Sequence, residues 1–294
     1  FVEGFEAADP AIASAIAIAQ EWETGIDDTT ARPSAGYAPL VEYLMHRCEE
    51  EGAHIWTSTT VQGITWKRGS VEVECAGAGG ASQLVRARAA VVTLPVGVLR
   101  YDGAVRFDPA LPESKCGALA RIEMGHAVKI ALGFATPFWE RVHSNRYRQA
   151  GFFRCESGSF AAFWTQYPIR GDIVMAWAGG PKATALHGKT ADELGELALA
   201  EFGSLLGETE VVLAEFEGSV MHDWSSDPFS RGAYSYVAVG GDGAREALAE
   251  PLEDTLFFAG EATSTDGQGG TVNGALRTGA RAAMEVLKAL AGRS

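Results

Sequence analysis

Two glycine-rich stretches near the carboxyl end of the chain have the composition of a ligand-binding turn. Residues 256–263 read Leu-Phe-Phe-Ala-Gly-Glu-Ala-Thr, and residues 269–275 read Gly-Gly-Thr-Val-Asn-Gly-Ala. A short apolar run that stops at Gly260 is typical of a buried strand, and Glu261 follows at the carboxyl edge, where α/β sheets bind ligands. Small side chains let backbone N–H groups and the positive end of a following helix approach a flat or anionic ligand. The pattern predicts either a cofactor cradle or a plain connection between strand and helix.

A single amine and a pair of aromatic side chains are the other candidates for chemistry. Lys129 lies in residues 127–134, where alternation puts four large apolar side chains on one strand face and leaves this amine alone among small residues on the other. Such a lysine either faces solvent or serves a site. Tyr234 and Tyr236, two residues apart, point the same way on a strand, either as packing or as ligand contacts.

The elements that would hold these residues follow from periodicity and capping. A helix from Gly274 to Leu290 is expected to present one small or apolar face, made by Ala275, Gly279, Ala280, Ala283, Leu287 and Leu290. Asp9 and Pro10 predict the start of a helix that runs to about residue 23, and a loop is expected at 24–34. Thr190 and Glu193 form a capping box that opens a helix to Leu206. Further elements are predicted as a helix at 37–51 and strands at 54–58, 61–67, 70–75, 84–88, 89–94, 127–134, 151–154, 159–166 and 173–178.

Bulk composition narrows the class of protein. The chain has 294 residues, 47% of them hydrophobic, which suffices for one large domain or two. The formal net charge of −14 argues against a nucleic-acid surface, and no apolar run is long enough to cross a membrane. The cysteines have neither metal-ligand nor disulfide-framework spacing, so we expect no metal site and a cytoplasmic location; they are Cys48, Cys75, Cys116 and Cys155.

The glycine-rich stretches, followed by a helix of small residues, resemble the carboxyl-terminal flavin-binding segment of the flavin-dependent amine oxidases. That family includes monoamine oxidases, polyamine oxidases and the flavin histone lysine demethylases. The run from Trp224 to Tyr236 is similar to the segment that precedes the flavin motif, and Met124-Gly125 before Lys129 looks like the family's lysine strand. The resemblance implies FAD as cofactor, a small-molecule amine as substrate, and oxidation to imine and aldehyde with O2 reduced to H2O2.

The resemblance also assigns roles to residues. Lys129 would hold a water at the flavin N5, while Tyr234 and Thr271 would line the slot for the amine. The residues implied to bind the cofactor are Val61, Trp224, Gly260, Glu261, Gly270, Thr271, Val272 and Ala275. Ala233 stands where some members have a cysteine linked to the flavin, so we expect non-covalent FAD. Thr271 replaces the second tyrosine of the monoamine oxidase cage, which brings the site closer to the polyamine oxidase and demethylase pattern.

The resemblance implies a mixed α/β fold of two parts. An FAD-binding domain without its N-terminal βαβ unit would comprise residues 35–94 and 224–294, and a substrate domain with a mixed, mainly antiparallel sheet and helices would comprise 1–34 and 95–223. The sequence has no G-x-G-x-x-G, so the chain matches about the C-terminal two-thirds of the family, and a missing N-terminal segment or a separate chain would supply the rest.

Two other functions stay open from the sequence. An L-amino-acid oxidase needs a cation for the substrate carboxylate, which Arg146, Arg148 or Arg154 could provide. A flavin-free scaffold or binding subunit would explain why the dinucleotide motif is not seen.

Overall fold

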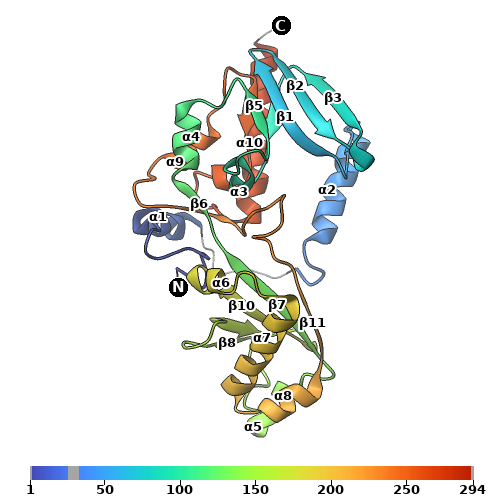
Figure 1. Ribbon diagram of the computed structural model, residues 1–294, viewed down its shortest axis with the longest axis vertical. Helices are drawn as coiled ribbons and strands as arrows, with labels where there is room; N and C mark the ends of the chain where they lie inside the picture. The colour runs from blue at the N-terminus through green and yellow to red at the C-terminus, as the bar shows by residue number, and fades with distance from the viewer. Residues whose placement is uncertain (1, 26–32, 293–294) are drawn as a thin grey trace.

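The computed structural model describes residues 2–25 and 33–292. Figure 1 shows two parts along the longest axis: a five-stranded sheet with its helices at one end, and a smaller sheet with the C-terminal helix at the other. The observed fold is the mixed α/β arrangement that the sequence predicts. Residues 26–32 of the predicted loop lie outside the described residues.

The larger sheet is antiparallel throughout, with strand order β11-β7-β10-β9-β8. Its strands are β7 (Ala127–Phe134), β8 (Phe152–Arg154), β9 (Ala162–Trp164), β10 (Ile173–Gly179) and β11 (Phe216–Met221). Alternation on β7 is as predicted: Ile130, Leu132 and Phe134 enter the main core, whereas Lys129 is exposed on the opposite face. The sheet therefore has one face packed against helices and an opposite, partly buried face, here called the open face, on which Lys129 is exposed.

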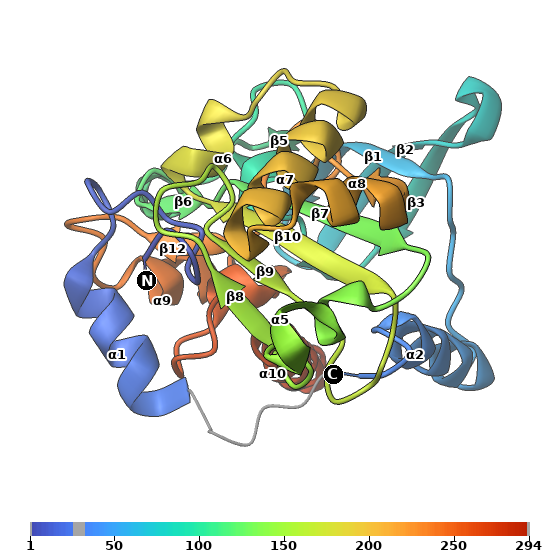
Figure 2. The ribbon, with the colours of Figure 1, turned by 90° about the horizontal axis from the view of Figure 1, so that it is seen from below.

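Helices cover the core face of this sheet. Figure 2 shows α7 (Ala191–Leu206) and α8 (Thr209–Glu215) lying across β7 and β10. The predicted capping box is present, because the Thr190 hydroxyl accepts the Glu193 N–H and the Glu193 carboxylate accepts the Thr190 N–H. Gly207 ends α7 in the left-handed conformation (φ 68°). Shorter helices in this part are η2 (Phe138–Glu140), α5 (Val142–Asn145) and α6 (Pro181–Ala185).

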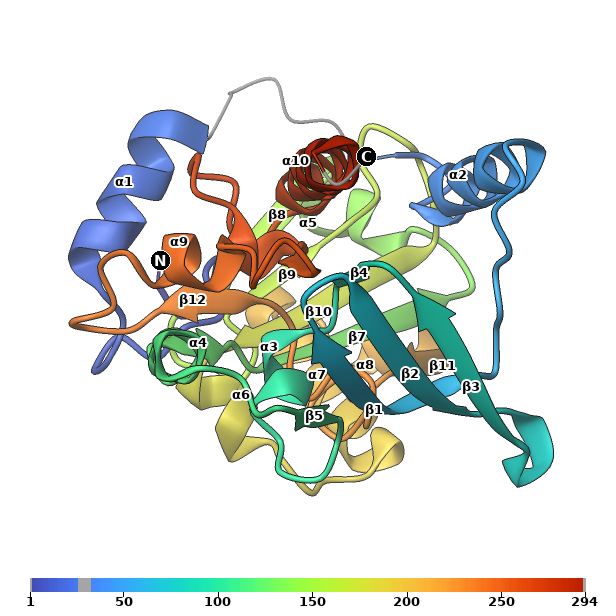
Figure 3. The same ribbon diagram turned by 90° about the horizontal axis from the view of Figure 1, so that it is seen from above.

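The smaller part has three layers (Figure 3). A four-stranded sheet of order β3-β2-β1-β5 packs on one face of the parallel pair β13-β4, and α10 packs on the other. The elements are β1 (Thr60–Lys67), β2 (Ser70–Ala76), η1 (Ala78–Gly80), β3 (Ser82–Ala87), β4 (Ala90–Val92), β5 (Arg106–Asp108), β13 (Leu256–Phe258), η3 (Glu261–Thr263) and α10 (Val272–Ala291). β13 is fully buried, as expected for a strand with both faces covered.

A third group of elements joins the two parts. It consists of α1 (Ala15–Gly25), α3 (Val96–Leu99), α4 (Glu113–Leu119), β6 (Ile122–Met124), β12 (Ser235–Val237) and α9 (Ala244–Ala249). Val96, Leu119 and Ile122 pack in one cluster with Leu248 and Ala262. Residues 96–124 thus lie against the 224–294 segment, although the sequence-based division puts them in the substrate domain. The division at residue 94 stays a prediction.

Three predicted elements differ from the structure. The first helix begins at Ala15, not at Pro10, because Ala13 pairs with Ala238 in a β-bridge and Ser14 Oγ caps the helix by accepting the Ala17 N–H. Residues 54–58 form no strand, since they pair with no strand in the described part of the chain.

The third difference is the face of α10 that is buried. Gly274, Thr278 and Ala282 are buried, whereas Ala283 and Leu287 on the predicted face are exposed. On the buried side the Thr278 hydroxyl accepts the Gly260 N–H at 3.0 Å, and Ala282 packs in one cluster with Phe257 and Ala259.

Candidate functional site

A cavity of about 250 Å³ opens at the carboxyl ends of the two parallel strands β4 and β13. Its wall includes Thr93, Leu94 and Pro95 after β4, and Gly260 and Glu261 after β13. Ala233 and Ala275 add small side chains from the preceding loop and the first turn of α10. The cavity lies where parallel strands end, which is the position at which open α/β sheets bind ligands.

Gly260 makes the corner at which β13 leaves the sheet. Its φ of 117° is a conformation that L side chains rarely adopt, so the strand can turn here only at a glycine. The Thr278 hydroxyl accepts the Gly260 N–H, which fixes the corner against α10. The corner thereby leaves the cavity wall without side-chain bulk.

The carboxylate of Glu261 joins the two glycine-rich stretches and the tyrosine strand. Its Oε2 accepts the Ser235 hydroxyl at 2.7 Å and the Gly270 N–H at 2.8 Å, and its Oε1 accepts the Ser235 N–H at 3.2 Å. Three segments that are separate in sequence therefore meet at one side chain. Glu261 is part of the cavity wall as well as the link that holds the loop before α10.

Thr271 caps the amino-terminal end of α10. The Thr271 hydroxyl accepts the Gly274 N–H at 2.9 Å and donates to the Gln268 carbonyl at 2.8 Å. A side chain at Gly274 would have its Cβ 2.0 Å from the Gln268 carbonyl oxygen, so this close approach requires glycine. Thr271 and Val272 are exposed, and neither contributes to the cavity wall.

Tyr234 lies beside the glycine loop. The hydroxyl of Tyr234 donates a hydrogen bond to the Phe5 carbonyl. Burial, with a further contribution from the nearby Glu6 carboxylate, raises the pKa of Tyr234 above its ordinary value. The phenol is therefore neutral at physiological pH.

Lys129 is on the open face of the larger sheet, opposite Trp177 of β10. Its Nζ lies 5.7 Å from the centre of the Trp164 ring, within cation–π range. Both tryptophans are on the same open face, and Trp177 donates from Nε1 to the Gly4 carbonyl at 2.8 Å. Lys129 is not part of the wall of the 250 Å³ cavity.

Two other predicted cofactor residues lie outside this cavity wall. Trp224 is 46% exposed and contacts the His222 ring with centroids 4.4 Å apart. Val61 is on β1 and packs against the cluster that contains Ile64 and Trp66. Gly260, Glu261 and Ala275 are together in the wall. Gly270 is joined to it by the N–H that Glu261 accepts, and Thr271 by its carbonyl, which accepts the Ala275 N–H. The roles predicted for all these residues stay predictions.

The sequence indicates no role for Ser235 or Arg245. Ser235 lies between Tyr234 and Tyr236, and no helix is predicted from the sequence around Arg245. Ser235 is 3% exposed and Arg245 7% exposed. No local pattern signals such burial, because the partners of both side chains come from distant parts of the sequence.

The described residues contain neither a metal-ligand cluster nor a membrane-spanning helix. No group of three or more His, Cys, Asp or Glu side chains in residues 2–25 and 33–292 could hold a metal ion. Within the same residues, no helix has both the length and the apolar content needed to span a membrane.

Sequence relatives of this chain are lysine-specific histone demethylases. Lysine-specific histone demethylase 2 of Homo sapiens is 31% identical over 268 residues, which is 88% of this chain and 30% of the human protein. Lysine-specific histone demethylase 1 homolog 3 of Arabidopsis thaliana is 34% identical over 218 residues, which is 69% of this chain and 12% of that protein. The chain therefore spans less than a third of the length of each of these relatives.

Solved structures of amine oxidases have the same fold. Cyclohexylamine oxidase from Brevibacterium oxydans superimposes with a TM-score of 0.73 at 20% identity, covering 97% of this chain and 62% of that protein. Putrescine oxidase bound to putrescine gives a TM-score of 0.68 at 21% identity, covering 84% of this chain and 52% of that protein. The model of the family named flavin containing amine oxidoreductase matches residues 1–287. On this match the chain belongs to the flavin-containing amine oxidoreductase family.

Proposed function

We propose that this chain forms the flavin-ring and substrate half of an FAD-dependent amine oxidase. The observation that carries the proposal is the junction at Glu261, which joins the Tyr234 strand and the loop before α10 beside a cavity at the ends of two parallel strands. The family uses flavin, and the amine oxidases among the solved structures support an amine as substrate.

The residues around the cavity fit the flat ring end of FAD. The wall is made of backbone, small side chains such as Ala233 and Ala275, and apolar groups such as Leu94 and Pro95. Ala233 offers no thiol for a covalent link, so the cofactor is bound non-covalently. Bound FAD would accept a hydride equivalent from the amine's α-carbon and pass two electrons to O2, giving H2O2.

The chain's own residues would orient the amine and exclude water. Tyr234 and Thr271 would line the amine slot. Tyr234 is neutral, and its hydroxyl is held by the Phe5 carbonyl, while the Thr271 hydroxyl caps α10. The Lys129 ammonium would hold a water near the flavin edge. The substrate's C–N unit, oxidised to an imine, takes up water to give aldehyde and a free amine. Putrescine, cyclohexylamine and the methylated lysine side chain are candidate substrates, because related proteins are named for them.

A dinucleotide-binding segment is the proposed partner of this chain. No G-x-G-x-x-G occurs in the sequence, and the solved amine oxidases extend beyond the matched region. We expect the adenosine-diphosphate part of FAD to contact such a segment, on the same polypeptide or on another. A cytoplasmic location stays a prediction.

The three arginines that the L-amino-acid oxidase alternative would use for the substrate carboxylate lie away from the cavity. Arg146, Arg148 and Arg154 are exposed, and none of them is in the wall of the 250 Å³ cavity. The amine oxidases among the solved structures also favour amine oxidation over amino-acid oxidation.

Flavin uptake and peroxide formation test the proposal. The chain is expressed alone and joined to a family βαβ segment that contains G-x-G-x-x-G; FAD is then titrated and followed by its absorbance spectrum. Peroxide is measured with putrescine, cyclohexylamine, a methylated-lysine peptide and L-amino acids. We expect flavin uptake in the joined protein and peroxide with one of the amines, reduced in Lys129→Met. A colourless, inactive joined protein would instead support the flavin-free scaffold.

A further inference from the structure

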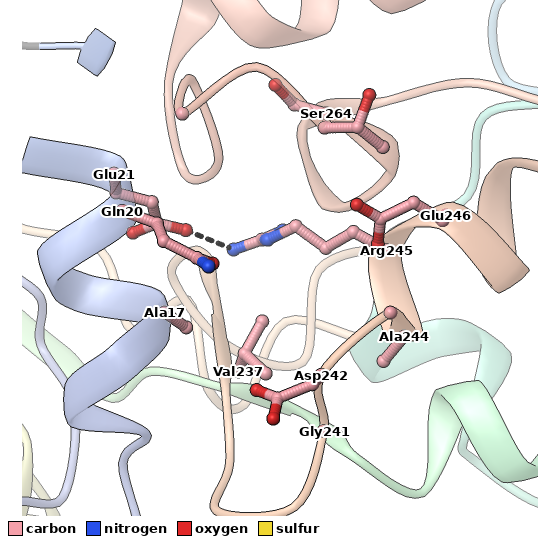
Figure 4. Close-up of a pocket in the computed structure, with 13 residues that line it drawn as sticks. Ala17, Gln20, Glu21, Val237, Gly241, Asp242, Ala244, Arg245, Glu246 and Ser264 are labelled. Carbon is pink, nitrogen blue, oxygen red and sulfur yellow. Dashed lines mark hydrogen bonds and ion pairs between the residues drawn. The ribbon is translucent and has the colours of Figure 1, made fainter. Parts of the chain in front are cut away.

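Arg245 of α9 is a buried cation shared by three segments. Its guanidinium donates to the Ser235 hydroxyl at 2.9 Å, to the Ser235 carbonyl at 3.2 Å and to the Glu21 carboxylate of α1 at 3.2 Å. Figure 4 shows the side chain extending from α9 toward Glu21 across a cavity of about 330 Å³. One planar group thereby fixes α1, β12 and α9 relative to one another.

The contacts continue from Arg245 to the loop before α10. The Ser235 hydroxyl, which accepts from Arg245, donates to Glu261 Oε2, and the same oxygen accepts the Gly270 N–H at 2.8 Å. Arg245 Nη1 also lies 3.4 Å from the Glu261 carbonyl oxygen. A Cβ on Gly269 would be 2.5 Å from Arg245 Nη2, so the loop backbone rests directly on the guanidinium.

Charge balance explains why a cation is needed at this position. Arg245 Nη1 lies 3.9 Å from Glu261 Oε2, in addition to its ion pair with Glu21. Burial raises the pKa of Glu21 and of Glu6, and Arg245 opposes the increase in both. Without the guanidinium, partly buried carboxylates would face one another with no counter-charge.

We propose that Arg245 is a positioning residue for the site. Through its contacts with Ser235 and Glu261, Arg245 positions Tyr234 and the first turn of α10. Its ion pair with Glu21 links these two segments to α1. The consequence for flavin binding rests on the proposed function, whereas the effect on the loop does not. Arg245 touches neither the 250 Å³ cavity nor Tyr234 directly, so it acts only through these intermediates.

Hydrogen exchange of the loop amides in this chain alone tests the positioning. Arg245→Met should speed exchange in residues 268–274 by about tenfold or more, because the charge-assisted contacts that hold Glu261 are lost. Arg245→Lys keeps the positive charge but lacks the planar guanidinium with its several N–H donors, and should give an intermediate exchange rate. Arg277→Met is the matched control, since Arg277 is 65% exposed and pairs with Asp266 of the same loop region. Equal rates in Arg245→Met and Arg277→Met would overturn the proposal.

Two further variants separate positioning from charge neutralisation and from misfolding. Ser235→Ala removes the bridge to Glu261 and leaves Arg245 in place; it should also speed exchange in 268–274. Adding Glu21→Gln to Arg245→Met should recover thermal stability while loop exchange stays fast. Recovery of slow exchange in this double variant would show that Arg245 only balances charge.

Flavin affinity provides the readout that depends on the proposed function. In the protein joined to a dinucleotide-binding segment, Arg245→Met should raise the FAD dissociation constant about tenfold, with Arg277→Met unchanged. An unchanged constant beside a wild type that binds FAD contradicts this part of the inference. A wild type that binds no FAD refutes the proposed function, while the exchange rates still decide the role of Arg245.

Discussion

The ammonium group of Lys115 closes the C-terminal end of α9, next to the strand that leads to the cavity. Lys115 is 1% exposed, and its Nζ donates to the carbonyls of Ala247 at 2.9 Å, Leu248 at 2.7 Å and Glu250. It also lies 4.2 Å from the centre of the Phe258 ring. Helix ends leave carbonyl groups without partners, and here a side chain from α4 satisfies them.

Substitution of Lys115 should change how stability depends on pH. Burial lowers the pKa of Lys115 to about 8 from an ordinary 10.5. Between these values the unfolded chain binds the proton more tightly than the folded one, so this residue's contribution to the unfolding free energy rises with pH by up to about 3 kcal/mol. Urea unfolding of wild type and Lys115→Met at pH 7.5 and 9.5 measures how the difference in unfolding free energy changes with pH. The wild type should gain stability relative to the variant at the higher pH; a constant difference would contradict the lowered pKa.

The glycines of the two glycine-rich stretches can be interpreted from the sequence, because each meets a requirement of the backbone at its own position. Gly260 needs its positive φ and Gly274 has no room for a Cβ, and both requirements select glycine directly. Arg245 and Lys115 were not predicted as site or core residues. Their burial depends on contacts with Ser235 and with the end of α9, which sequence spacing does not reveal.

At the scale of elements, α10 shows which helix features periodicity can predict. Its extent and its position after the glycine loop agree with the sequence prediction. The sequence puts Ala283 and Leu287 on one small or apolar face, whereas the side that packs against the β13 segment contains Thr278 and Ala282. Strand β7 was predicted correctly, since its two faces differ strongly in apolar content.

The cap of α10 provides a prediction for an element. Thr271→Ala removes the hydroxyl that accepts the Gly274 N–H, and should lower the unfolding free energy by about 1 kcal/mol. Thr271→Ser keeps the hydroxyl and should be close to wild type. Urea denaturation of the three proteins measures the difference. If the serine variant lost as much stability as the alanine variant, the cap would not be the source of the effect.

Over the whole molecule, apolar side chains are distributed unevenly. No residue of α2 (Ala38–Glu50) is buried, and Figures 2 and 3 show this helix standing apart from the sheets. Val41 is 52% exposed on α2, and Leu287 on α10 is 63% exposed. In contrast, α7 contributes Leu199 and Phe202 to the main core. The larger sheet and its helices thus form the largest hydrophobic cluster in the described part of the chain.

Alanine substitutions should reveal this asymmetry. Val41→Ala should change the unfolding free energy by less than about 0.5 kcal/mol, because the side chain is exposed. Leu199→Ala, at a position 4% exposed, should cost about 2–5 kcal/mol. Urea denaturation of the two variants makes the comparison. A large cost at Val41 in this chain would mean that α2 packs against a partner in solution.

The sequence by itself indicated the family and the mixed α/β class through a resemblance. It also determined the strand at 127–134, with Lys129 apart from the large apolar side chains, and the end of a buried strand at Gly260. The strand and its end follow from short-range rules, because side-chain alternation and capping act within a few residues, whereas the family follows from the resemblance of whole motifs. Only the tertiary structure revealed the junction of Glu261 with Ser235 and Gly270, the buried Arg245, and the packing of residues 96–124 beside the cofactor segments. Each of these contacts joins residues that are far apart in the sequence. Such contacts form only when the chain folds and excludes water from between the side chains.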